Sequence, residues 1–91
     1  MVDMSLVDGL FVELIAVSRP YLTDVERLEV QRLLDEAEYQ LALETFVHIF
    51  IDGGKSATQH VFSLITRLTG MLQMPMDDTI SRIPRLPPGA A

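Results

Sequence analysis

Apolar residues recur at every third or fourth position over residues 4–18, which is the spacing of a helix that buries one face. Asp3 or Ser5 can cap the start of this helix. Pro20 ends it, because the residue before a proline is pushed out of the α-helical conformation. The pattern therefore predicts a first helix over these residues. Its apolar positions are Leu6, Val7, Leu10, Phe11, Leu14, Ile15 and Val17.

Residues 33–51 combine the most apolar part of the chain with the start of its densest acidic cluster. When this segment is read as a helix from about Glu38, its apolar side is wide enough to be contacted by more than one neighbour. Leu41 is the exception, since it falls among the polar positions. We therefore expect this helix to be the centre of the fold. Its apolar side consists of Tyr39, Ala42, Leu43, Phe46, Val47, Ile49 and Phe50.

Thr23 and Glu26 form a capping-box pattern, in which each side chain bonds to the backbone N–H of the other residue. The second helix that starts here runs to about Asp35. Its principal apolar side is Val30, Leu33 and Leu34. Val25 and Leu28 lie away from that side. They either pack against a second neighbour or form the apolar centre of an acidic contact surface.

Residues 35–38 are predicted to separate the second and third helices, although a single helix over residues 24–51 is the alternative because no Gly or Pro marks the break. Gly53 or Gly54 can take the left-handed conformation that closes a helix. Ser56 then opens a second capping-box pattern, over residues 56–59. The fourth helix follows, with its apolar face formed by Ala57, Val61, Leu64, Ile65, Leu68 and Leu72.

The helical pattern fades after Pro75. Residues 77–82 can form a short helical turn, and the prolines at 84, 87 and 88 favour an extended or disordered tail. We therefore predict an all-α fold, a compact bundle of about four short helices. The expected division is a helical domain over residues 1–75 and a short turn with a Pro-rich tail over residues 76–91.

The composition suits one globular domain, since 91 residues of which 48% are hydrophobic can bury a core. The absence of cysteine excludes disulfides, thiolate metal sites and a thiol nucleophile. No apolar run reaches the roughly 18–20 residues that cross a bilayer, and the acidic start is unlike a secretory signal. A cytoplasmic protein is expected.

The charge is −6 and is distributed unevenly. Residues 1–52 contain eleven acids and three bases, whereas residues 53–91 contain two acids and four bases. The first part therefore repels nucleic acid and anionic membranes, and a basic protein surface would complement it. An ordinary solvated acidic face is the alternative.

The candidate chemical motifs are weak. Lys55 and Ser56 follow glycine as in a phosphate-binding loop, but Ile49 stands where that motif needs its first glycine. Glu44 and His48 share a helix face, where a solvated ion pair is commoner than a metal or acid–base site, and no third ligand has characteristic spacing. We therefore predict no enzyme activity, no cofactor and no metal.

Residues 30–44 resemble a stretch of small bacterial immunity proteins, including the Maf-type family and related immunity proteins of contact-dependent growth inhibition systems. The shared pattern is a helix ending in two leucines, an acidic turn, and a Glu-Tyr pair that opens a long helix. Ala37 stands where we expect glycine in that pattern. The residues that carry it are Leu33, Leu34, Asp35, Glu36, Glu38, Tyr39 and Leu41 to Glu44, with Leu64 and Leu68 similar further on.

The resemblance implies a non-catalytic antitoxin that binds and neutralises a cognate toxin domain. Together with the charge, it leads to the prediction that an acidic surface occludes the active site of a basic nuclease. The alternative is a helical adaptor or regulatory subunit that binds a partner through an apolar groove. The predicted partner contacts are Glu29, Asp35, Glu36, Glu38 and Asp52, with Tyr39 added if its hydroxyl edge is exposed rather than at the boundary of the core.

Overall fold

The computed structural model describes residues 4–87, and this part of the chain is all-α, as predicted. Four helices of twelve or more residues form the fold, and one short helix follows them. The described residues contain no strand. The elements are α1 (Met4–Ser18), a 3₁₀ turn (Arg19–Tyr21), α2 (Asp24–Asp35), α3 (Tyr39–Asp52), α4 (Gln59–Met71) and α5 (Asp77–Ile80).

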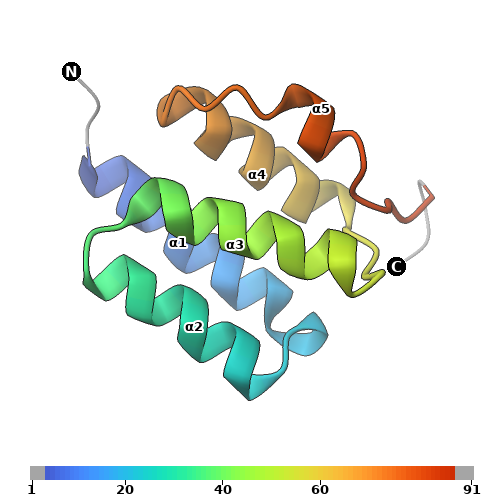
Figure 1. The fold of residues 1–91 in the computed structure, drawn as a ribbon, viewed down its shortest axis with the longest axis horizontal. Helices are drawn as coiled ribbons and strands as arrows, with labels where there is room; N and C mark the ends of the chain where they lie inside the picture. Colours follow the sequence, from blue (N-terminus) through green and yellow to red (C-terminus); the bar gives the residue numbers. More distant parts are fainter. Residues whose placement is uncertain (1–3, 88–91) are drawn as a thin grey trace.

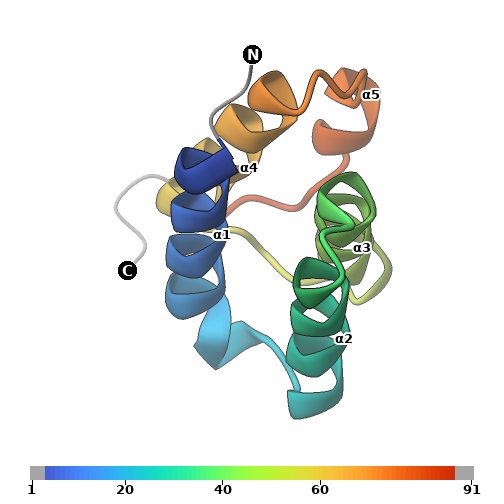
Figure 2. The same cartoon turned by 90° about the vertical axis from the view of Figure 1, so that its left-hand side faces the viewer.

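The helices form two layers (Figure 1, Figure 2). One layer is the hairpin of α2 and α3, and the other pairs α1 with α4, which lie side by side although they are distant in the sequence. The two apolar sides face each other across the space between the layers. In Figure 1, α2 lies at the lower edge of the molecule and α5 lies at the upper edge.

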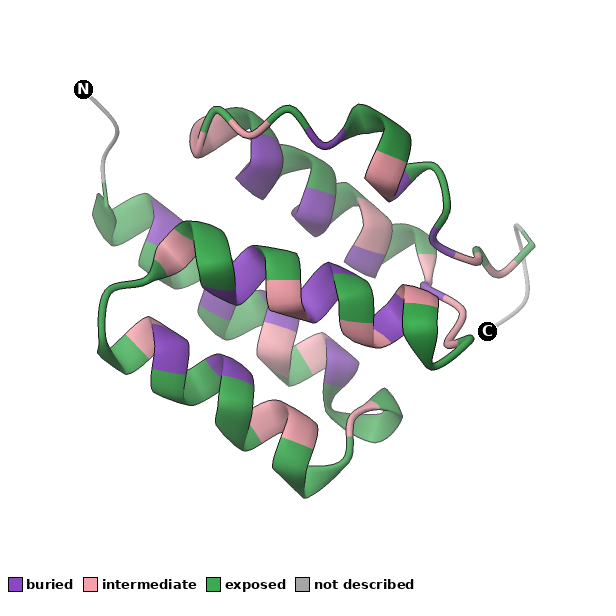
Figure 3. Cartoon of the chain, in the orientation of Figure 1, coloured by how far each residue is buried: buried purple, intermediate pink, exposed green. Residues whose placement is uncertain are grey.

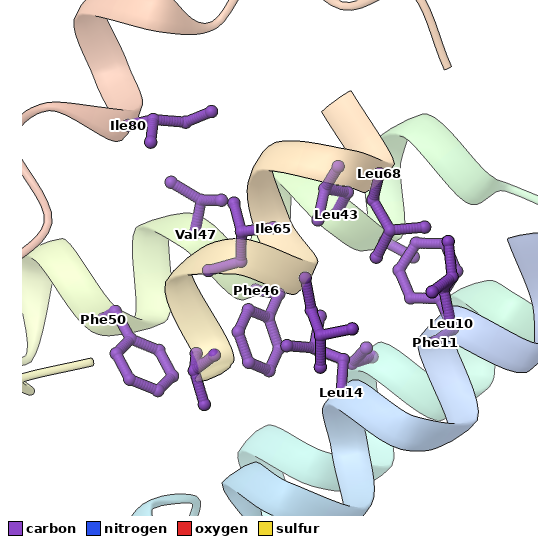
Figure 4. Close-up of a cluster of buried hydrophobic side chains, with 14 of the residues drawn as sticks. Leu10, Phe11, Leu14, Leu43, Phe46, Val47, Phe50, Ile65, Leu68 and Ile80 are labelled. Atoms are coloured by element: carbon purple, nitrogen blue, oxygen red, sulfur yellow. The ribbon is translucent and has the colours of Figure 1, made fainter. Parts of the chain in front are cut away.

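The helix α3 is the central helix, as its wide apolar side predicted. It packs against both α2 and α4, and the side chains of Ala42, Leu43 and Phe46 are fully buried. Phe46 stacks on Phe50 with ring centroids 5.1 Å apart, and Figure 4 shows both rings among side chains from α1 and α4. Figure 3 shows the buried residues of each long helix along its inward side.

The helix α2 begins at the predicted capping box. Thr23 Oγ1 accepts from the Glu26 N–H at 3.1 Å, and Glu26 Oε1 accepts from the Thr23 N–H at 2.9 Å. The predicted break after Asp35 is also confirmed, because α2 and α3 are separate helices. Two backbone bonds close α2, from the Glu38 N–H to Leu33 O at 2.8 Å and from the Ala37 N–H to Leu34 O at 3.0 Å.

The same closing motif ends α3 and α4, with a left-handed residue at the equivalent position each time. That residue is Ala37 after α2, Gly54 after α3 and Gln73 after α4, with φ of 59°, 62° and 55°. Gly54 thus provides the turn that the glycine pair predicted. The other two positions show that the motif forms here without glycine.

The start of α4 corrects one prediction. The capping residue is Thr58, whose Oγ1 accepts from the Val61 N–H at 3.1 Å, and not Ser56. The reason is a contact that is distant in the sequence: the Ala57 N–H donates to Pro84 O at 2.7 Å and Ala57 O accepts from the Leu86 N–H at 3.0 Å. This pairing keeps residue 57 extended, so the helix begins two residues later.

The core continues past residue 75, where the sequence pattern fades. Met76, Ile80 and Ile83 are buried and belong to the same cluster as the long helices. Ile80 points towards the α3–α4 side of the core in Figure 4. The predicted short helical turn is present as α5, and residues 84–86 are extended along Ala57. Pro88 and the residues after it, which are the end of the expected tail, lie outside the described residues.

Two expectations about apolar side chains are wrong. Leu6, placed on the buried side of the first helix, is 48% exposed. Val25 and Leu28 do not pack against a second neighbour, since they are 78% and 57% exposed. The helix α2 is an edge element that packs mainly on α3, so its outer face has no helix to cover it.

Candidate protein-binding surface

The outer face of α2 carries the most exposed large apolar side chain of the described residues. Val25 is 78% exposed, and Leu28 lies almost one turn further along the same face at 57%. Glu29, Asp35 and Glu36 lie on this face too, because residues three, four and seven apart share one side of a helix. We call this surface the α2 outer face. It places apolar side chains among acidic ones, which is the geometry that the second predicted arrangement, an acidic contact surface with an apolar centre, requires.

Arg32 forms ion pairs with two of the predicted contact residues, Glu29 and Glu36. Its Nη2 lies 2.7 Å from Glu29 Oε1, and its Nη1 lies 2.7 Å from Glu36 Oε2. The hydrogen bond from Arg32 lowers the pKa of Glu29, and the same bond, with the charge of Glu29, raises the pKa of Arg32. The charge of Glu29 and Glu36 is therefore partly compensated within α2.

The remaining predicted acids at this end are less compensated. Asp35 accepts a hydrogen bond from Gln31 at 3.0 Å, which leaves its charge in place. Glu38 is exposed at the start of α3, where its side chain makes no capping bond. The structure thus brings four of the predicted acids together on the second half of α2 and the following turn: Glu29, Asp35, Glu36 and Glu38.

Tyr39 lies at the boundary of the core. Its side chain is half-buried against the hydrophobic cluster, and its ring lies 6.2 Å from that of Phe11. Hydrogen bonding to the Asp8 carboxylate raises the pKa of the Tyr39 hydroxyl. The ring and hydroxyl are thus both engaged by α1, so the side chain joins the two layers.

Asp52 lies apart from the other predicted acids. It is at the end of α3, fourteen residues from Glu38, a separation of about 21 Å along a helix. It lines a groove instead, in which one wall is Glu26 of α2 and the rest is mostly α3. The α3 side chains of this groove are Leu41, Glu44, Thr45, His48, Ile49 and Asp52. We call it the α3 groove.

The α3 groove is not apparent as a site from the sequence pattern. Its one signal was Leu41, the apolar residue among polar positions, which is 48% exposed. Glu44 and His48 also line a second groove on the other side of α3, against Met74 and Pro75. The outward row of α3 is therefore a ridge with a groove on each side.

The charges of the α3 groove differ from those of the α2 outer face. Glu26 lies 3.3 Å from Lys55 Nζ, and the hydrogen bond from the Thr23 backbone, with this lysine, holds its pKa below the ordinary value. Within residues 4–87, Glu44 and Asp52 make neither an ion pair nor a hydrogen bond through their side chains. The groove therefore retains two uncompensated carboxylates.

The histidines do not form a recognisable reactive site. His48 makes no ion pair with Glu44 in the described part of the chain, in contrast to the expected solvated pair. Nε2 of His60 on α4 instead lies 2.6 Å from Oε2 of Glu13 on α1. This contact joins the two helices of one layer. No group of three or more potential metal-ligating side chains is found among the residues described.

Two further findings bear on the class of protein. None of the helices in residues 4–87 is long and apolar enough to cross a membrane. Comparison of the chain with protein families, with curated proteins and with solved structures finds no match. The candidate surface therefore rests on the geometry and charges of this chain.

Proposed function

We propose that this protein is an immunity protein, an antitoxin that binds and neutralises a cognate bacterial toxin domain in the cytoplasm. The toxin domain is a nuclease, whose basic active-site groove is occluded by the acidic α2–α3 layer. The observation that carries the proposal is the α2 outer face, where Val25 and Leu28 are exposed beside Glu29, Asp35 and Glu36.

The two kinds of side chain have separate roles in this proposal. Exposed carboxylates opposite lysines and arginines raise the association rate and fix the docking orientation. Apolar side chains at the centre of an interface provide much of the affinity once they are desolvated. Val25 and Leu28 are large enough to act as such a centre, and they stand clear of the core.

The test is co-expression with the product of the adjacent gene, as the candidate toxin. Reversing Asp35, Glu36 and Glu38 to lysine should abolish protection of the cell while the helical circular dichroism signal stays intact. The control reverses Asp77 and Asp78, which are exposed on α5 at the opposite edge of the molecule. Protection that survives the first set of changes, or is lost equally with the control, would contradict the acidic mechanism.

A helical adaptor or regulatory subunit is the second candidate. The α3 groove favours it, because Leu41 and Ile49 line this groove and an apolar partner helix can pack on them. Leu41 is 48% exposed. The two candidates differ in their response to salt. An acidic inhibitor should lose association rate steeply as ionic strength rises, whereas an adaptor that binds through apolar contacts should not.

A further inference from the structure

The α3 groove differs from the α2 outer face in whether its carboxylates already have a cationic partner. On α2, Arg32 bonds to both Glu29 and Glu36, so a basic partner would have to compete with an existing cation. In the groove, Glu44 and Asp52 have no such competitor among residues 4–87. An incoming basic side chain would therefore gain more from Glu44 and Asp52 than from Glu29 or Glu36.

The groove also has an apolar component beside its acids. Leu41 is 48% exposed, and Ile49 is half-buried two turns further along the same lining. A partner that desolvated these side chains would gain affinity that does not depend on charge. The combination requires a ligand that is basic and apolar at once.

The spacing of the two acids restricts the shape of that ligand. Glu44 and Asp52 are eight residues apart on α3, which is about 12 Å along the axis. Basic residues seven apart on a partner helix lie on one face and are about 10.5 Å apart, a difference that long side chains can absorb. A residue midway between them would lie beside His48 and Ile49, whereas Leu41 lies three residues before Glu44, about 4.5 Å outside the stretch between the two acids.

We propose that the α3 groove binds a helix of the toxin domain that carries two basic side chains seven residues apart, with an apolar side chain three residues outside the one that meets Glu44. This inference rests on the proposed function and specifies the partner's chemistry. Glu44 and Asp52 receive the basic side chains, and Leu41 receives the apolar one.

The probe is a synthetic helical peptide with two arginines seven positions apart and a leucine three positions outside one of them, and its control has glutamine in place of both arginines. Titration of the whole labelled protein should shift the amide signals of Leu41, Glu44, His48 and Gly53 and leave those of the α2 outer face in place. The glutamine peptide should bind at least fivefold more weakly, as expected for the loss of two exposed ion pairs.

Matched variants separate a defined site from general attraction to an acidic protein. Glu44→Gln with Asp52→Asn should weaken binding of the arginine peptide by about fivefold to tenfold. Asp77→Asn with Asp78→Asn changes the charge equally at another edge and should weaken it less than twofold. Leu41→Ser should weaken binding without changing its dependence on salt.

Equal weakening by the two double variants, or shifts confined to the α2 outer face, would overturn the groove assignment. The proposed function has its own readout, which is protection of the cell after charge reversal at residues 35, 36 and 38. If that reversal abolishes protection while the peptide fails to bind the groove, only the inference about the groove is wrong. If the peptide binds as expected but the reversal leaves protection intact, the acidic mechanism at the α2 outer face is wrong.

Discussion

Ala37 and Gly54 occupy the same position in the same helix-closing motif, with φ of 59° and 62°. Each donates its N–H to the carbonyl three residues earlier, at 3.0 Å and 3.2 Å. Only Gly54 adopts this conformation at little steric cost, since a Cβ in the left-handed region crowds the backbone. The α2–α3 turn is therefore closed by a residue that is strained there.

The first prediction is that Ala37→Gly stabilises the protein. Relief of the left-handed strain should raise the free energy of unfolding by about 0.5–1 kcal/mol, and Gly54→Ala should lower it by at least as much. Both positions are exposed, so packing changes little. Urea unfolding of the two variants and of the double variant measures this. The prediction is wrong if the double variant differs greatly from the parent protein in its free energy of unfolding, or if Ala37→Gly is less stable than the parent.

The second prediction concerns acid stability. The folded-state pKa of Glu26 is lowered by the Thr23 backbone bond and by Lys55, so its ionised form favours the folded state. That stabilisation is present above the ordinary glutamate pKa of about 4.3 and is lost as pH falls through the lowered value. Glu26→Gln should therefore destabilise the protein at pH 7, and the difference from the parent should shrink towards pH 3. Urea midpoints at both pH values measure it.

Glu44→Gln is the matched control for that experiment, because Glu44 makes no ion pair or hydrogen bond within the described residues. Its effect on the urea midpoint should be small at pH 7. If the urea midpoint of Glu44→Gln depended on pH as that of Glu26→Gln does, overall charge rather than the capping box would determine the stability at low pH.

The third prediction is that the apolar residues of the α2 outer face do not stabilise the fold. Val25→Ser with Leu28→Ser should change the free energy of unfolding by no more than about 0.5 kcal/mol per site, since both side chains are largely in solvent. Binding to the proposed toxin domain should weaken. Phe46→Ala is the contrast, because removing this fully buried ring should lower the free energy of unfolding by about 3–5 kcal/mol. A large loss of stability in the serine variants would show that these residues belong to the core.

The fourth prediction concerns Ser18, whose side chain is fully buried at the end of α1. Its Oγ has no hydrogen-bond partner among the described residues. A buried unsatisfied hydroxyl costs about 1–3 kcal/mol, so Ser18→Ala should raise the free energy of unfolding by about 1 kcal/mol. Thermal unfolding measures this, and a lower melting temperature would indicate that the hydroxyl is satisfied in solution.

Local patterns in the sequence were sufficient to predict most of the fold. The capping box at Thr23 needs only residues three apart, and the width of the apolar side of α3 follows from its own sequence. Residues that depend on distant partners were harder to place. Thr58 begins α4 because Ala57 pairs with the extended residues 84–86, a contact that no local pattern indicates.

The candidate site shows the same division. The acids of α2 are close in the sequence and also lie close together in the fold, but Asp52 lies with Glu26 in the α3 groove because α2 and α3 run side by side. Pairing of Glu29 and Glu36 with Arg32 depends on rotamers, which the sequence does not specify. Leu41 stood out in the sequence as an apolar residue among polar positions. That it lines a groove beside Glu26 of α2 became apparent only from the structure.

The extended segment that pairs with Ala57 also places Arg85 over the ring of Phe62, 4.0 Å from its centroid, and anchors Ile83 in the core. During synthesis, a chain tethered at its C-terminal end cannot complete this arrangement until residue 86 has left the ribosomal tunnel. Until then the apolar surface that Met76, Ile80 and Ile83 later cover stays open to water. A nascent chain is therefore prone to aggregation at that stage, and chaperone binding should recognise the uncovered surface of the core.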